Sequence, residues 1–142
     1  MERFEGRCHC GNLSFVFETS AGLNELGLRA CQCSFCRAHN AQTTSDPNGV
    51  VHFSVHEPEL LSRYRMGHGI TDFLICARCG VFVAAMMEHG GTQLMTVNAN
   101  VFRPCPPRNL SVNRVDYSTE SVDQRIARRR LRWTPVRAFK MA

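Results

Sequence analysis

Alternation of apolar and polar residues is the strongest periodic signal along this chain. In residues 12–19, Leu13, Phe15 and Phe17 recur at every second position. A period of two places such residues on one face of a strand, which packs against a core. Comparable apolar segments recur along the chain, and we predict strands at residues 12–19, 26–33, 50–55, 60–65, 71–76, 81–87 and 92–97. The chain is therefore predicted to be mainly β.

Glycine and proline separate these predicted strands and limit the other elements. Residues 66–69 (MGHG) and 88–91 (EHGG) each join two strands over a distance short enough for a hairpin. Residues 102–108 contain three prolines, which remove backbone donors and exclude regular structure. Helical character is confined to a stretch near residues 120–131. Since no linker or internal repeat divides the chain, we expect residues 1–142 to form one domain.

Composition is that of an ordinary globular protein. Of the 142 residues, 44% are hydrophobic and 20% are charged. No run of about 18 apolar residues could span a bilayer. The first ten residues, MERFEGRCHC, lack the apolar core of a signal peptide. We therefore expect a cytoplasmic protein in a reducing environment, without membrane contact.

The cysteines are clustered rather than spread along the chain. A disulfide framework places cysteines far apart to close long loops, whereas clustered cysteines in a reducing compartment are more often metal ligands. Cys105 stands alone, and the other seven of the eight cysteines form three groups: Cys8 and Cys10; Cys31, Cys33 and Cys36; Cys76 and Cys79. This spacing predicts metal binding.

Two of the groups complement each other as one closed site. Cys76 and Cys79 have the Cys-x-x-Cys spacing that supplies two zinc ligands from one turn. Cys8 and Cys10 are the natural second pair, and four thiolates make a structural zinc site. His9 lies between two ligands that converge on one metal, so its ring is expected to point away.

The remaining group offers three ligands within six residues, Cys31, Cys33 and Cys36. Three protein ligands and one open position describe a catalytic zinc site. A structural site completed by His39 or Cys105 is the alternative, and the spacing alone does not separate the two. An iron–sulfur cluster is a third alternative, although the spacing matches none of the ferredoxin patterns.

The chemistry of an open site with three thiolates follows from its charge. Three thiolates on Zn²⁺ leave a net charge of about −1, so the metal is a weak Lewis acid for water. Such a metal still deprotonates an incoming thiol, and the thiolate is the nucleophilic form. Addition of an exogenous thiol to a small electrophile, or the reverse cleavage, is the expected reaction class.

Positive charge is concentrated near the C-terminus. The net charge is +5, and residues 125–133 (RIARRRLRW) contain five arginines. Glu120 and Asp123 lie near the start of the predicted helix, where they suit its dipole. One interpretation is a solvated helix face, and the other is a patch for nucleic acid or for an anionic small molecule.

Three cysteine motifs, GRCHCGNLSF, CQCSFCR and FLICARCGV, resemble those of the glutathione-dependent formaldehyde-activating enzyme family, which includes the centromere protein V domain. The resemblance covers roughly residues 4–102. It implies an Mss4-like zinc-bound fold of stacked antiparallel sheets, here with a short C-terminal helix and an arginine-rich segment at residues 120–142. It also implies two zinc ions per chain, one structural and one catalytic, held by Cys8, Cys10, Cys76 and Cys79 and by Cys31, Cys33 and Cys36.

The reaction implied by the resemblance is the addition of glutathione to formaldehyde, which gives S-(hydroxymethyl)glutathione and is formally a carbon–sulfur lyase reaction in reverse. A related aldehyde or thiol is a variant of this hypothesis. The alternative is a non-catalytic zinc module whose arginine-rich C-terminus contacts nucleic acid or protein. The oligomeric state is left open, with a homodimer as one alternative.

One position departs from the family pattern, and the motifs do not include a set of residues that binds glutathione. After Cys36, Asn40 stands near a position where the family has glycine, and asparagine can adopt the same left-handed conformation. The carboxylates of glutathione call for arginine or lysine contacts, for which Arg29, Arg37 and Arg78 are candidates.

Overall fold

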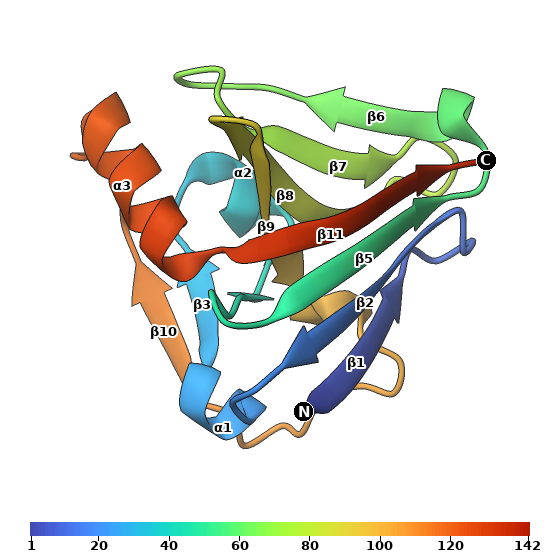
Figure 1. Cartoon of the computed structure of the whole chain (residues 1–142), viewed down its shortest axis with the longest axis horizontal. Coiled ribbons are helices and arrows are strands. Elements are labelled where there is room, and N and C mark those ends of the chain that lie inside the picture. Colours follow the sequence, from blue (N-terminus) through green and yellow to red (C-terminus); the bar gives the residue numbers. More distant parts are fainter.

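Eleven strands form one branched sheet in the computed structural model, which describes all 142 residues (Figure 1). Two short helices lie in the first third of the chain and one longer helix lies near its end. The strands are β1 (Glu2–Arg7), β2 (Leu13–Thr19), β3 (Leu28–Cys31), β4 (Thr43–Thr44), β5 (Val50–Val55), β6 (Leu61–Tyr64), β7 (Asp72–Cys76), β8 (Phe82–His89), β9 (Thr92–Asn98), β10 (Val112–Val115) and β11 (Thr134–Met141). The helices are α1 (Leu23–Leu26), α2 (Ser34–Ala38) and α3 (Val122–Arg132), with 3-10 turns at Pro58–Leu60 and Ala99–Val101.

The predicted mainly β fold with a short C-terminal helix is confirmed. Each of the seven predicted strands corresponds to one observed strand, from β2 to β9 without β4. The predicted hairpins are the antiparallel pairs β6–β7 and β8–β9. The proline-rich stretch contributes no strand, only an isolated bridge from Phe102 to Gly6.

The sheet branches at β9, which has β8 on one edge. Its other edge pairs with β11 through Leu94 and Met95, and then with β4 through Val97 and Asn98. The branches are β11–β5–β2–β1, β4–β3–β10 and β8–β7–β6. Most pairs are antiparallel, but β11 runs parallel to β5, and β10 runs parallel to β3.

Six helices and strands of the fold were not predicted from the sequence: β1, β4, β10, β11, α1 and α2. β11 is the most consequential of them, because it lies between β5 and β9 and connects β5, β2 and β1 to the rest of the sheet (Figure 1). Its ring of Phe139 stacks on Phe53 with centroids 5.1 Å apart. The C-terminal segment is therefore an internal part of the sheet rather than an appendage.

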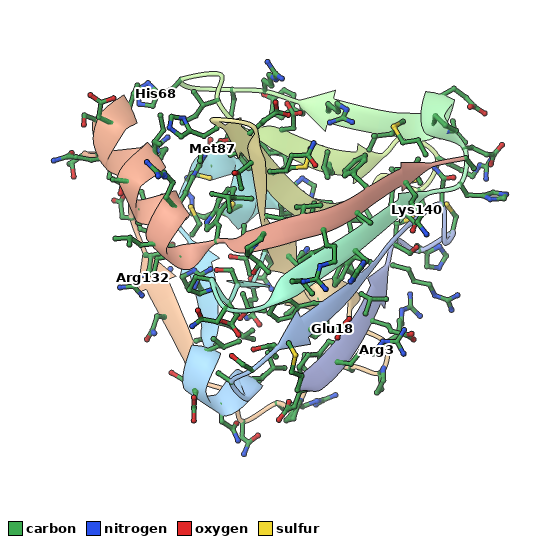
Figure 2. All side chains as sticks on the ribbon, in the orientation of Figure 1. Arg3, Glu18, His68, Met87, Arg132 and Lys140 are labelled. Carbon is green, nitrogen blue, oxygen red and sulfur yellow. The ribbon has the colours of Figure 1, made fainter.

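Side chains from opposite branches form two adjoining hydrophobic clusters. The larger contains the inward face of β2, where Leu13, Phe15 and Phe17 are all buried as their alternation predicts. The smaller contains Phe82 and Trp133 and includes Cys36. It lies beside α3, where Met87 packs beneath the helix while Arg132 is exposed on the outside (Figure 2).

α3 is the longest helix, with eleven residues, and none of the helices combines the length and hydropathy required to cross a lipid bilayer.

Candidate metal centres and the adjoining cavity

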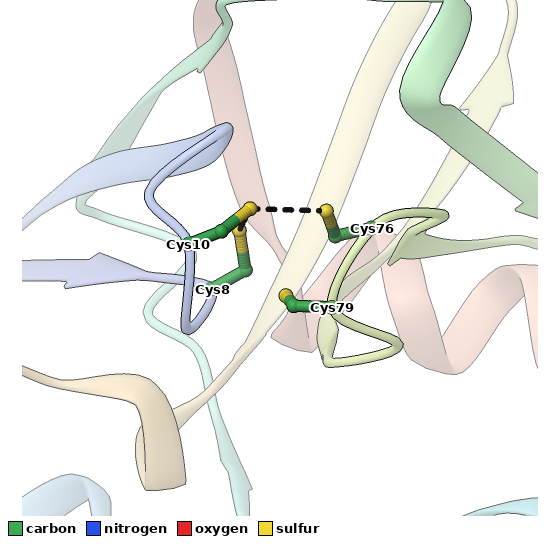
Figure 3. A group of neighbouring side chains, drawn as sticks. All are labelled: Cys8, Cys10, Cys76 and Cys79. Atoms are coloured by element: carbon green, nitrogen blue, oxygen red, sulfur yellow. Dashed lines mark hydrogen bonds between the residues drawn. The ribbon is translucent and has the colours of Figure 1, made fainter.

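The first cysteine group brings together two turns that are distant in sequence. Cys8 and Cys10 follow β1, Cys76 ends β7, and Cys79 precedes β8. All four Sγ atoms lie within 4.8 Å of one another (Figure 3). The Sγ of Cys10 is 3.8 Å from that of Cys8 and 3.5 Å from that of Cys76. A tetrahedron of sulfur atoms with Zn–S bonds of about 2.3 Å has edges of about 3.8 Å, so this group fits a tetrahedral metal ion.

The two turns share one backbone design. In each, the amide of the first cysteine donates to a carbonyl five residues later, from Cys8 to Leu13 at 2.9 Å and from Cys76 to Val81 at 3.1 Å. Each turn also contains a glycine at positive φ, Gly11 at 85° and Gly80 at 77°. Glycine adopts this conformation without strain, which lets both chains reverse directly after a ligand.

Hydrogen bonds and burial drive the thiol pKa values in this group apart. Burial raises the pKa of Cys8 to about 12. Burial also opposes ionisation of Cys79, but the amides of Cys10 and Val81 lower its pKa to about 6 overall. Thiols this close cannot all ionise without a cation, so the donor set calls for one. His9 is exposed and does not join the group.

The second group lies where β3 passes into α2. Cys31 is the last residue of β3, Cys33 caps the N-terminus of α2, and Cys36 lies within the helix. The amide of Cys36 donates to the Sγ of Cys33 at 3.3 Å. The three Sγ atoms lie within 4.8 Å of one another, so they could also hold a metal ion.

No fourth cysteine, histidine or carboxylate joins this second group. His39, which was an alternative fourth ligand, is exposed and packs on Phe35 with ring centroids 4.6 Å apart. Cys105, the other alternative, is exposed in the proline-rich stretch. Asn40 has a φ of 49°, so it supplies the left-handed conformation expected at this turn. The second group therefore presents three thiols where the first presents four.

The thiols of the second group are also unequal. The hydrogen bond with Cys36 is the main cause that lowers the pKa of Cys31, to about 6, and the amide of Cys33 and the charge of Arg128 act in the same direction. The same hydrogen bond and burial raise the pKa of Cys36. Cys31 is therefore the more readily ionised of these two thiols.

A cavity of about 280 Å³ opens beside the second group. Its wall contains all three of these thiols, while none of the four cysteines of the first group contributes to it. Its lining combines apolar and aromatic residues with arginines and one carboxylate, Asp116. The aromatic and apolar residues include Met66, Phe73, Phe82, Ala85 and Trp133, and the arginines are Arg29, Arg125, Arg128 and Arg129.

Three of the five arginines in residues 125–133 line this cavity: Arg125, Arg128 and Arg129. Arg128 donates to Glu120 at 2.8 Å, Arg125 donates to the same carboxylate at 3.4 Å, and Arg128 also lies 3.5 Å from the ring centroid of Tyr117. Arg130 and Arg132 are exposed and do not line the cavity. The basic segment therefore directs most of its charge inward.

The three arginines that were candidates from the sequence for binding carboxylates lie in different parts of the structure. Arg29 lines the cavity. Arg37 is exposed, and Arg78 pairs with Glu57 at 2.7 Å beside the first cysteine group. The cavity arginines of α3 were predicted only as part of residues 125–133, for which a patch for an anionic small molecule was one alternative. Positions 125, 128 and 129 share one helix face, which is the signal that separates them from the rest of the segment.

Fold and site together define a mainly β protein with two cysteine groups that could hold metal ions, compatible with an Mss4-like zinc fold. A sequence model of the glutathione-dependent formaldehyde-activating enzyme family matches residues 3–116, so the chain belongs to this family. The resemblance predicted from the motifs is thereby confirmed. The matched region contains both cysteine groups and ends before α3.

Comparison with solved structures supports the fold. A crystal structure of a Rhodobacter sphaeroides protein is similar, with a TM-score of 0.59 and 24% sequence identity. The match covers 78% of this chain and 99% of that one. Comparison with curated proteins found no match.

Proposed function

We propose that this protein is a zinc-dependent carbon–sulfur lyase that joins glutathione to formaldehyde or a related small aldehyde. The observation that carries the proposal is the group of Cys31, Cys33 and Cys36 in the cavity wall, with no fourth protein ligand. Three ligands with an open position are typical of catalytic zinc sites. Membership of the formaldehyde-activating family supports the choice of substrates.

The two groups are proposed to hold one zinc ion each, with different roles. The first has four thiols, two of them from the fully buried Cys8 and Cys76, and it lies outside the cavity wall. A closed set of four thiolates suits a structural ion. The second faces the cavity and suits a catalytic one. Thiolate ligands persist in a reducing compartment, so the proposal also places the protein in the cytoplasm.

The proposed reaction forms one carbon–sulfur bond. A zinc ion held by Cys31, Cys33 and Cys36 would act as a Lewis acid that lowers the pKa of a thiol in the cavity. The sulfur of glutathione attacks the aldehyde carbon, the carbonyl π electrons pass to oxygen, and that oxygen takes up the proton which the thiol released. Phe73, Phe82 and Trp133 make part of the lining apolar, and an apolar wall favours addition of the thiol over hydration of the aldehyde.

The direction of the arginines favours an enzyme over the alternative of a nucleic-acid-binding module. A module of that kind needs a basic outer surface, since phosphate contacts supply most of its affinity. Here Arg125, Arg128 and Arg129 line the cavity, and only Arg130 and Arg132 of this segment are exposed. A small anionic substrate fits this arrangement better than a polyanion.

Serine substitution in each cysteine group tests the proposal. Wild-type protein is expected to bind two zinc ions and to form S-(hydroxymethyl)glutathione faster than the uncatalysed reaction. Cys31→Ser is expected to keep its fold, bind one zinc ion and lose catalysis to the background rate. Cys76→Ser is expected to unfold or to melt at a much lower temperature. Elemental analysis, circular dichroism and exchange NMR of the adduct measure these quantities.

Cys105→Ser is the matched control, because this exposed cysteine lies outside both groups and is expected to change nothing. Retained catalysis in Cys31→Ser would refute the catalytic role of the second group. Unfolding of Cys31→Ser to the extent seen in Cys76→Ser would show that both groups are structural.

A further inference from the structure

We infer that Arg29 and Arg129 form an anion subsite in the cavity, which binds two carboxylate groups of the substrate thiol from separate points. The identity of the thiol as glutathione rests on the proposed function. The subsite itself rests on two cationic side chains that line the cavity and have no carboxylate partner in the protein.

Arg129 is a buried cation with an incomplete set of partners. It is 7% exposed, and its guanidinium donates to the hydroxyl of Thr71 and lies 3.8 Å from the sulfur of Met87. Its central carbon is 4.3 Å from the ring centroid of Trp133. Its Nε is buried and has no hydrogen-bond partner. Burying an arginine without an ion pair is costly, and a ligand carboxylate beside the guanidinium at the cavity wall would offset that cost.

Arg29, on β3, likewise forms no ion pair. Its guanidinium donates to the hydroxyls of Ser45 at 2.6 Å and Thr96 at 3.3 Å. The other two cavity arginines, Arg125 and Arg128, share the carboxylate of Glu120. The arginines thus divide into a pair that forms ion pairs with Glu120 and a pair that forms no ion pair.

Burial has a matching effect on the titration of Arg129. It is the main cause that lowers the pKa of Arg129 to about 9, and the charges of Arg128 and Arg125 lower this pKa further, whereas those of Glu120 and Cys31 act in the opposite direction. A bound carboxylate would relieve this effect, because an opposite charge nearby stabilises the charged form.

The two guanidinium groups are anchored at separate points of the sheet. Arg129 contacts Met87 on β8, and Arg29 donates to Thr96 on β9. Met87 pairs with Leu94, so Met87 and Thr96 are diagonal neighbours on one face, about 7–8 Å apart. A ligand with a carboxylate at each end and a thiol between them, as in glutathione, can reach both arginines and the cysteine group.

Arg129 lies on α3, after the region that matches the family, whereas Arg29 lies within it. One half of the proposed subsite therefore depends on the C-terminal segment of this chain. The C-terminal segment thus gives the cavity a preference for a thiol that carries two carboxylates.

Fluorescence of Trp133 provides a direct test, since it is the only tryptophan and lines the cavity. The probes are S-methylglutathione, which keeps both carboxylates but has no free thiol, and its dimethyl ester. S-methylglutathione is expected to change the fluorescence saturably, and the ester to bind at least about tenfold more weakly. Arg29→Gln and Arg129→Gln are expected to weaken S-methylglutathione by about tenfold or more, and the control Arg130→Gln to leave its affinity unchanged.

Absence of binding, equal binding of the ester, or wild-type affinity in both Arg29→Gln and Arg129→Gln would overturn the subsite. If circular dichroism shows that Arg129→Gln does not fold, Arg29→Gln and the ester comparison decide the outcome. S-methylglutathione cannot react, so its binding is measured separately from turnover of glutathione and formaldehyde. Carboxylate-dependent binding of this probe, together with no turnover of glutathione and formaldehyde, would reject the proposed reaction and keep the subsite. Turnover with equal binding of the ester would reject the subsite and keep the reaction.

Discussion

Cysteines of one chain acquire different chemistry from their neighbouring groups. Cys8 and Cys76 are fully buried between strands, where burial raises the pKa of both thiols and favours enclosure of a cation. Cys31 lies at a cavity wall, where Cys36 and the charge of Arg128 lower its pKa to about 6. The same residue type therefore suits a closed site in one place and an accessible site in the other.

A second example at this scale is Asp46, a buried acid in the turn before β5. Its carboxylate accepts hydrogen bonds from the hydroxyl of Thr19, the amide of Ser20 at 3.1 Å and the amide of Asn48 at 2.9 Å. Burial acts to raise its pKa, but these donors prevail and lower it below the ordinary value. The carboxylate therefore stabilises the fold in its charged form.

Asp46→Asn is expected to reduce the free energy of unfolding by about 1–3 kcal/mol at pH 7. Because the pKa of Asp46 is lower in the folded state, its contribution is fully present above the ordinary pKa of about 4 and is lost as the pH falls through the folded value. The difference between wild type and Asp46→Asn should thus shrink as the pH falls from 5 towards 3. Urea unfolding across this range measures it, and a constant difference would contradict the assignment.

Among the elements, α3 links the fold to the cavity. Its first turn is held by a capping box, in which the amide of Gln124 donates to the hydroxyl of Ser121 at 3.1 Å and the side chain of Gln124 accepts from the amide of Ser121 at 2.9 Å. Its inner face carries Arg125 and Arg129 into the cavity wall. Its end leads directly into β11, between β5 and β9.

Ser121→Ala is expected to lower the free energy of unfolding by about 1 kcal/mol, because it leaves the amide of Gln124 without its partner. Thr119→Ala, at an exposed position before the helix, is the control and should be neutral within about 0.5 kcal/mol. Chemical denaturation of both variants gives the comparison. Equal stabilities of the two variants would show that the box contributes nothing to the folded state.

In the whole molecule, the first cysteine group joins the turn after β1 to the turn between β7 and β8. Cys10 and Cys76 are 66 positions apart in the sequence. β1 is the last strand of one branch of the sheet, and β7 belongs to another branch. A metal ion at this group therefore closes a long loop and connects two branches directly.

Removal of metal is expected to lower the melting temperature strongly, because the free energy of binding at such a site is part of the folding free energy. The check is thermal unfolding followed by circular dichroism, with and without a strong chelator and with a reducing agent present throughout. Cys31→Ser should show the same decrease, since it keeps the first group. An unchanged melting temperature after complete metal removal would contradict this role.

Local spacing along the chain was sufficient for much of the fold and for the membership of both cysteine groups. Alternation in residues 12–19 identified β2, because a strand repeats every two residues whatever it packs against. Cys76 and Cys79 indicated a ligand pair because a single turn brings both side chains towards one metal ion. Asn40 indicated a left-handed turn because few residue types adopt that backbone conformation. These features depend on contacts within a few positions.

Only the tertiary structure decided which distant groups share the cavity. It placed β11 between β5 and β9, turned Arg129 inward while leaving Arg130 exposed, and kept His39 and Cys105 away from the second cysteine group. Each of these outcomes depends on residues tens of positions apart. Local periodicity does not encode such pairings, because the same helix face or strand could pack against several partners, and the lowest free energy of the whole chain selects one.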